Sequence, residues 1–254
     1  GDGPVPLALE DEDEPVEIAP GASRRFAYRH EWREQGLEGV IFDLDGVLVS
    51  TDRLHYRAWK ELADELSLAF DEELNHQLRG VSRAEALGVI YRQNNRPPPA
   101  DDELAAQCAR KNARYRELVG ALTPRDVLAG AVELLRALRA EGVRRAVASA
   151  SRNTPLVLER TGLGQYLDAV SDGNNVRRGK PDPEGIEIAA QRMRVLPWGC
   201  VGVEDAAAGI EAIHNAGMPA VGIGDQDIGA DLQVVSVSEL RVEALRKLLN
   251  EPRS

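Results

Sequence analysis

Residues 40–48 read Val40-Ile41-Phe42-Asp43-Leu44-Asp45-Gly46-Val47-Leu48, an apolar run that ends on two carboxylates and a glycine. Alternate residues of an extended strand point to the same side, so Asp43 and Asp45 emerge together where the strand leaves its sheet. A bound cation would neutralise one carboxylate, and different surroundings would leave the other free for proton transfer. The alternative is an ordinary turn, because Asp45-Gly46 is also typical turn sequence.

Three later segments place polar side chains where a strand meets a loop. Residues 145–151 are rich in small and β-branched types and end in hydroxyls, a lysine lies in the Pro-containing loop 178–183, and the apolar run 200–203 leads into two acids. Each has a structural explanation when taken alone, namely a helix cap, a solvated lysine and a helix start. Together with residues 40–48 they indicate a single site, because parallel strands present their carboxyl ends at one edge of a sheet.

The spacing of apolar residues from position 37 onward predicts alternating strands and helices. Strands are expected at 39–42, 145–149, 169–171, 200–203, 220–223 and 232–237. Such alternation predicts an α/β fold, a Rossmann-like parallel sheet core with helices on both faces, formed by residues 37–51 and 127–254.

One long stretch interrupts this alternation. Residues 52–126 contain only helical patterns, near 54–62, 72–78, 83–92 and 102–118, which predicts an inserted all-helical cap domain. Residues 1–36 contain the acidic run 10–14 between Gly- and Pro-containing segments, and we expect an irregular N-terminal appendage there.

Composition excludes several classes of partner. The 254 residues are 43% hydrophobic and 29% charged, as in ordinary globular proteins, and the formal net charge of −11 argues against nucleic acid or an anionic membrane as partner. No apolar stretch approaches the roughly 20 residues needed to span a bilayer, and no signal-peptide core is present, so we expect a cytoplasmic protein. Cys108 and Cys200 are too few and too far apart for a disulfide framework or a zinc site.

The four strand-end segments, in this order, resemble the signatures of the haloacid-dehalogenase-like phosphotransferases. The resemblance rests on Phe42-Asp43-Leu44-Asp45-Gly46 and on the three downstream segments. It implies that Asp43 is the nucleophile, Asp45 the general acid/base, Ser149 a ligand of the transferring phosphoryl group and Lys180 its neutralising cation. It also implies Mg²⁺ as cofactor, with a ligand set of Asp43, the backbone carbonyl of Asp45, Glu204 and Asp205.

The helical insertion carries a more specific resemblance. Residues 51–60, the loop 78–83 and the triplet Arg110-Lys111-Asn112 resemble the β-phosphoglucomutase family, and the match runs from about residue 38 to the C-terminus. It implies interconversion of β-D-glucose 1-phosphate and glucose 6-phosphate through β-glucose 1,6-bisphosphate and an aspartyl phosphate. The expected partner is a hexose phosphate and the expected state is a monomer. The alternatives are a Mg²⁺-dependent sugar-phosphate phosphatase of the same superfamily and a non-catalytic sugar-phosphate sensor.

The second resemblance also assigns roles within the insertion. Arg83 would bind the phosphate that is not reacting, Lys111 would contact substrate and couple cap closure to binding, and His55 would link substrate binding to the placement of Asp45. Gly80 would let the loop backbone approach the sugar. By composition alone, Lys111 in a charged helix is expected to be solvated. The other substrate or phosphate ligands implied are Thr51, Trp59, Val81, Ala150, Ser151, Arg152 and Asn153.

Overall fold

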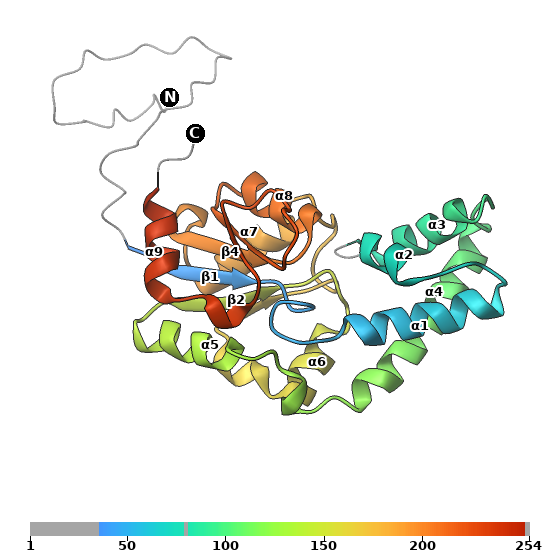
Figure 1. Ribbon diagram of the computed structural model, residues 1–254, viewed down its shortest axis with the longest axis horizontal. Helices are drawn as coiled ribbons and strands as arrows, with labels where there is room; N and C mark the ends of the chain where they lie inside the picture. The colour runs from blue at the N-terminus through green and yellow to red at the C-terminus, as the bar shows by residue number, and fades with distance from the viewer. Residues whose placement is uncertain (1–35, 79–80, 252–254) are drawn as a thin grey trace, which may run out of the picture. The chain divides into compact units, whose positions relative to one another are not determined.

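Six parallel strands form the sheet in the computed structural model, which describes residues 36–78 and 81–251 (Figure 1). Their order across the sheet is β3-β2-β1-β4-β5-β6, so the first strand lies in the middle. The strands are β1 (Gly39–Phe42), β2 (Arg144–Ala148), β3 (Ala169–Ser171), β4 (Cys200–Glu204), β5 (Ala220–Ile223) and β6 (Leu232–Val234). The predicted α/β fold is confirmed.

Helices cover both faces of this sheet, and for that reason strands β1 and β5 consist of buried apolar residues and glycine along their whole length. Val40 and Phe42 of β1 join one buried cluster, whereas Ile41 between them joins another on the opposite face. Helices α5 (Ala131–Ala140), α6 (Thr154–Thr161) and α9 (Val242–Asn250) contribute to the first cluster, and α7 (Glu184–Met193) and α8 (Ala207–Asn215) to the second (Figure 1).

Four α-helices lie between β1 and α5 in the described part of the sequence. They are α1 (Asp52–Glu65), α2 (Glu72–Gln77), α3 (Arg83–Gln93) and α4 (Asp101–Gly120). The first three share an apolar cluster of their own, which includes Trp59, Phe70 and Ile90. Ser82 begins α3 with a capping box, in which its hydroxyl accepts from the backbone N–H of Glu85. None of the described helices combines the length and apolar character needed to cross a membrane.

The last strand is shorter than its apolar pattern predicts. We expected it to continue to Val237, but β6 ends at Val234. The Ser236 hydroxyl accepts a hydrogen bond from the backbone N–H of Ser238 at 3.3 Å and starts a 3₁₀ turn, which buries Val237 without pairing it to a strand. The expected appendage, except for its last residue, and Gly80 lie outside the described residues.

Close packing of β4 on α8 makes Gly202 a test of the fold. A Cβ atom at Gly202 would lie 2.6 Å from the side chain of Ile213. We therefore expect Gly202→Ala to lower the free energy of unfolding by about 1–3 kcal/mol, measured by urea denaturation. Gly120 at the end of α4 has open space around its Cβ position, so Gly120→Ala should leave stability unchanged or raise it by up to about 1 kcal/mol. Equal effects of the two substitutions would contradict this account of the packing.

Candidate active site

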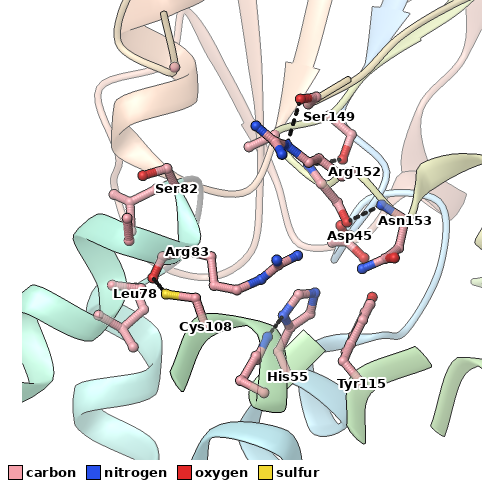
Figure 2. Close-up of a pocket in the computed structure, with 18 of the residues that line it drawn as sticks. Asp45, His55, Leu78, Ser82, Arg83, Cys108, Tyr115, Ser149, Arg152 and Asn153 are labelled. Carbon is pink, nitrogen blue, oxygen red and sulfur yellow. Dashed lines mark hydrogen bonds between the residues drawn. The ribbon is translucent and has the colours of Figure 1, made fainter. Parts of the chain in front are cut away.

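One cavity of about 570 Å³ is lined both by the carboxyl ends of the strands and by helices α1, α3 and α4 (Figure 2). Most of the residues expected at a site lie on its wall. They are Asp43, Asp45, His55, Trp59, Val81, Arg83, Lys111, Ser149, Ala150, Ser151, Arg152, Asn153, Glu204 and Asp205. Two others lie just behind the wall, since Thr51 donates a hydrogen bond to Asp45 and Lys180 contacts Asp43.

The carboxylates of Asp43, Glu204 and Asp205 gather at the centre of the sheet edge. Residue 42 is paired with Val203 in the register of β1 and β4, so Asp43 and Glu204 leave adjacent strands at the same level. The carboxylate oxygens of the three acids lie within 4.8 Å of one another. The ammonium of Lys180 lies 2.5 Å from Asp43 Oδ1 and 2.6 Å from Glu204 Oε2.

This acidic cluster has more negative charge than its lysine can neutralise. Burial disfavours the ammonium of Lys180, but the carboxylates of Asp43 and Glu204 outweigh it and raise its pKa, so Lys180 stays charged. Burial raises the pKa of Glu204 well above its usual value, and the neighbouring acids add to the effect. Clustered carboxylate oxygens are the donors that Mg²⁺ prefers. The donor set therefore fits a divalent cation.

Asp45 lies beside this cluster in different surroundings. Desolvation in the cavity, together with the charge of Asp43, raises the pKa of Asp45 to about 7, although the hydroxyl of Thr51 donates a hydrogen bond to its carboxylate. Gly46 follows with a φ of +86°, and a Cβ atom there would overlap the Asp205 carboxylate, so only glycine allows this turn. A carboxyl group with a pKa near 7 can both give and take a proton.

The loop after β2 is held in shape by its own hydroxyl groups. The backbone N–H of Ser151 donates to Ser149 Oγ, and that of Asn153 donates to Ser151 Oγ, each at 3.1 Å. Arg152 Nε donates to the backbone oxygen of Gly173 at 3.1 Å, which directs its guanidinium beside the loop (Figure 2). Hydroxyl, amide and guanidinium groups thus face the cavity from a preorganised loop.

Lys111 from α4 is buried in the opposite wall, with only 3% of its surface exposed. Its Nζ lies 2.9 Å from His55 Nδ1, and 4.7 and 4.8 Å from the ring centroids of Trp59 and Tyr115. Burial, reinforced by the charge of Arg83, lowers the pKa of Lys111 to about 7. Burial also lowers the pKa of His55, so His55 is neutral and its Nδ1 accepts from the ammonium. The expectation of a solvated lysine, taken from composition, is wrong.

Two arginines line the cavity from different parts of the chain, Arg83 from α3 and Arg152 from the loop after β2. Arg83 begins α3 and extends into the cavity (Figure 2). Burial lowers the pKa of Arg83, and the charge of Arg152 from the loop after β2 lowers it further, although Cys108 and Tyr115 act against both. Two cations that repel each other in this way would be stabilised by an anion bound between them.

Sequence reasoning missed several residues of α4 that lie at or next to the cavity. Cys108 and Tyr115 line the wall, and Asn112 contacts a lining residue, since its Oδ1 accepts from Arg83 Nη2 at 2.8 Å. The signal was helical spacing, because positions 108, 111, 112 and 115 lie three or four residues apart and share one face of a helix with Lys111. Because Lys111 faces the cavity, the other residues on that face of the helix point to the same side.

Comparison with known proteins identifies the family to which this site belongs. Residues 37–217 match the haloacid dehalogenase-like hydrolase family. The chain belongs to this family. The matched region runs from the first strand through α8, and in this chain it contains the acidic cluster, the loop after β2 and the helical insertion.

Members of the family with different activities resemble the chain to different degrees. A β-phosphoglucomutase of Bacillus subtilis is 39% identical over 83% of this chain and 95% of its own length. A fructose-1-phosphate phosphatase of Escherichia coli is 32% identical over 73% of this chain and 95% of its own length. The crystal structure of a β-phosphoglucomutase from Clostridium difficile superimposes with a TM-score of 0.80 at 34% identity, covering 84% of this chain and 97% of that one.

The environment of Lys111 predicts an unusual titration. The NMR signal of its side chain should titrate near pH 7 and not near the ordinary value of 10.5, because the buried ammonium lies beside the charge of Arg83. Arg83→Ala should move the midpoint upward, since it removes that charge. A midpoint that stays near the ordinary lysine value in the unmodified protein would contradict the buried placement of Lys111.

Proposed function

We propose that the chain is a β-phosphoglucomutase that interconverts β-D-glucose 1-phosphate and glucose 6-phosphate through β-glucose 1,6-bisphosphate. The observation that carries the proposal is a cavity with two groups of residues suited to bind phosphate. The first group is Lys180 and Ser149 beside the acidic cluster, and the second is Arg83 and Arg152. A sugar bisphosphate needs both, whereas hydrolysis of a monophosphate needs only the first. The similarity to β-phosphoglucomutases along most of the chain supports the same choice.

In the first half-reaction, an Asp43 that already carries a phosphoryl group meets β-glucose 1-phosphate. The oxygen of the C6 hydroxyl attacks phosphorus, Asp45 takes the hydroxyl proton, and the bond between phosphorus and Asp43 breaks. The products are free Asp43 and β-glucose 1,6-bisphosphate. The pKa of Asp45, raised to about 7, suits it to accept this proton and later return it.

The second half-reaction runs the same chemistry in reverse at the other end of the sugar. After the bisphosphate turns over, Asp43 attacks the phosphorus of the C1 phosphate, and the bond from phosphorus to the C1 oxygen breaks. Asp45 returns its proton to that oxygen and glucose 6-phosphate leaves. The distal phosphate lies between Arg83 and Arg152 in both orientations, so the sugar keeps its alignment with Asp43.

A Mg²⁺ ion would be held by Asp43, Glu204, Asp205 and the backbone carbonyl of Asp45, and would neutralise charge on the transferring phosphoryl oxygens. Lys180 supplies a further positive charge beside Asp43, and Ser149 a hydroxyl donor. Together these groups position and neutralise the phosphoryl group, which is most of what phosphoryl transfer requires of a protein.

The helical insertion acts as a cap in this proposal. His55 and Lys111 form a hydrogen-bonded pair on the wall of the cavity, and Thr51 links the start of α1 to the Asp45 carboxylate. Trp59 and Val81 shape the wall against the sugar. In a mutase, Asp45 takes up its catalytic position only when a sugar is bound, so water alone attacks the aspartyl phosphate slowly. A phosphatase, by contrast, hydrolyses its aspartyl phosphate rapidly.

Product analysis distinguishes these two activities. With β-glucose 1-phosphate, Mg²⁺ and a trace of β-glucose 1,6-bisphosphate, we expect glucose 6-phosphate as the main product in a coupled dehydrogenase assay. Asp43→Asn should lower kcat by at least about 1,000-fold, because an amide cannot form the phosphoenzyme. Inorganic phosphate as the main product would establish the phosphatase alternative. Binding of sugar phosphate without any turnover by the folded protein would establish the sensor.

Loss of the distal phosphate ligand should affect only substrates that have a distal phosphate. Arg83→Ala is expected to lower kcat/KM for β-glucose 1-phosphate by about 100-fold or more, since a charge-assisted bidentate contact is lost. Phosphorylation of Asp43 by acetyl phosphate, which has a single phosphoryl group, should change by less than about threefold. Equal losses in both reactions would show that Arg83 only maintains the structure of the cap.

A further inference from the structure

We propose that Asn112 is a positioning residue that aims the Arg83 guanidinium at the distal phosphate and ties the cap to the loop after β2. The inference deepens the proposed function and rests on it. Nothing in the motifs assigns Asn112 a role, although it directly follows Lys111 in the sequence. Its carbonyl oxygen is the point at which three separate segments of the chain meet.

The face of α4 that lines the cavity holds Arg83 at two points. Cys108 Sγ lies 3.7 Å from the backbone oxygen of Arg83, and one turn later Asn112 Oδ1 accepts from Arg83 Nη2 at 2.8 Å. The first contact fixes the start of α3 against α4, and the second fixes the direction of the side chain. Arg83 has other N–H donors on its guanidinium, which remain for two parallel hydrogen bonds to a phosphate.

The same oxygen of Asn112 also accepts from Asn153 Nδ2 at 2.8 Å. Asn153 is 3% exposed, and its backbone N–H is fixed by the hydroxyl of Ser151 in the loop that also contains Ser149. Asn112 therefore connects the distal site on the cap to the phosphoryl site on the core. Its orientation is determined by its partners, because two N–H donors converge on one atom and only the carbonyl end of the amide can accept both.

The physical need for such a residue comes from the repulsion between Arg83 and Arg152. Without an acceptor, the long side chain of Arg83 has many rotamers, and the charge of Arg152 favours those that point away from the cavity. A neutral amide oxygen holds the guanidinium without neutralising it. A carboxylate would hold it more strongly but would compete with the phosphate for the same cation.

The first test compares two variants with the unmodified full-length protein, all in the presence of Mg²⁺. Asn112→Ala should raise the dissociation constant for glucose 6-phosphate, measured by calorimetry, by about tenfold, and lower kcat/KM for β-glucose 1-phosphate by about tenfold. Acetyl phosphate should still phosphorylate Asp43 at the normal rate. Glu117→Ala on the exposed side of α4 is the matched control and should change none of these quantities.

A double-mutant cycle separates positioning from general support of the fold. If Asn112 acts through Arg83, then Arg83→Ala combined with Asn112→Ala should bind glucose 6-phosphate within about twofold of Arg83→Ala alone. Independent, multiplicative losses would overturn the inference. So would an unchanged dissociation constant in Asn112→Ala, or a large fall in melting temperature together with an equal loss of the acetyl phosphate reaction.

The calorimetric readout keeps this inference distinct from the proposed function. If the unmodified protein binds glucose 6-phosphate but releases inorganic phosphate as its product, the mutase proposal fails while the binding comparison still tests Asn112. If the unmodified protein makes glucose 6-phosphate and Asn112→Ala binds it normally, the inference about Asn112 fails and the mutase proposal stands.

Discussion

The structure depends on the collection of negative charge at one edge of a parallel sheet. Adjacent strands β1 and β4 end at the same level, so backbone pairing holds Asp43 and Glu204 close together with Asp205 although their carboxylates repel one another. Carboxylates repel one another when buried, and this cluster exists because the apolar faces of the sheet stabilise the fold around it. Lys180 neutralises part of the negative charge. A bound divalent cation would neutralise more of it and would allow a phosphoryl group to approach Asp43.

Different neighbours give two nearby carboxyl groups different chemistry. Asp43 contacts the ammonium of Lys180, whereas Asp45, two residues later, accepts a hydrogen bond from a hydroxyl, and desolvation together with the charge of Asp43 raises its pKa to about 7. One group is thereby suited to attack phosphorus and the other to transfer protons. The turn at Gly46 directly follows Asp45, and only glycine fits beside the Asp205 carboxylate at that backbone conformation.

The helical insertion adds positive charge at a distance from this cluster. Lys111 and Arg83 are both partly or fully desolvated, and each lowers the pKa of groups around it. Their burial is unfavourable without a ligand, and the aromatic rings of Trp59 and Tyr115 with the amide of Asn112 compensate only in part. A wall of this kind has the greatest affinity for a dianion, which is the charge of a sugar phosphate near neutral pH.

The sequence by itself determined the α/β fold, the approximate places of the six strands and the order of the polar strand ends, because continuous apolar runs bounded by turn residues are local signals. It also pointed to Asp43, Asp45, Ser149, Lys180, Glu204 and Asp205 as one set. Only the tertiary structure decided that β6 stops before Val237, that Lys111 is buried, and that Asn112 joins Arg83 to Asn153. These depend on contacts between segments far apart in the chain, such as α4 with α3 and with the loop after β2. A lysine or asparagine has no local preference that reveals which partner it will meet.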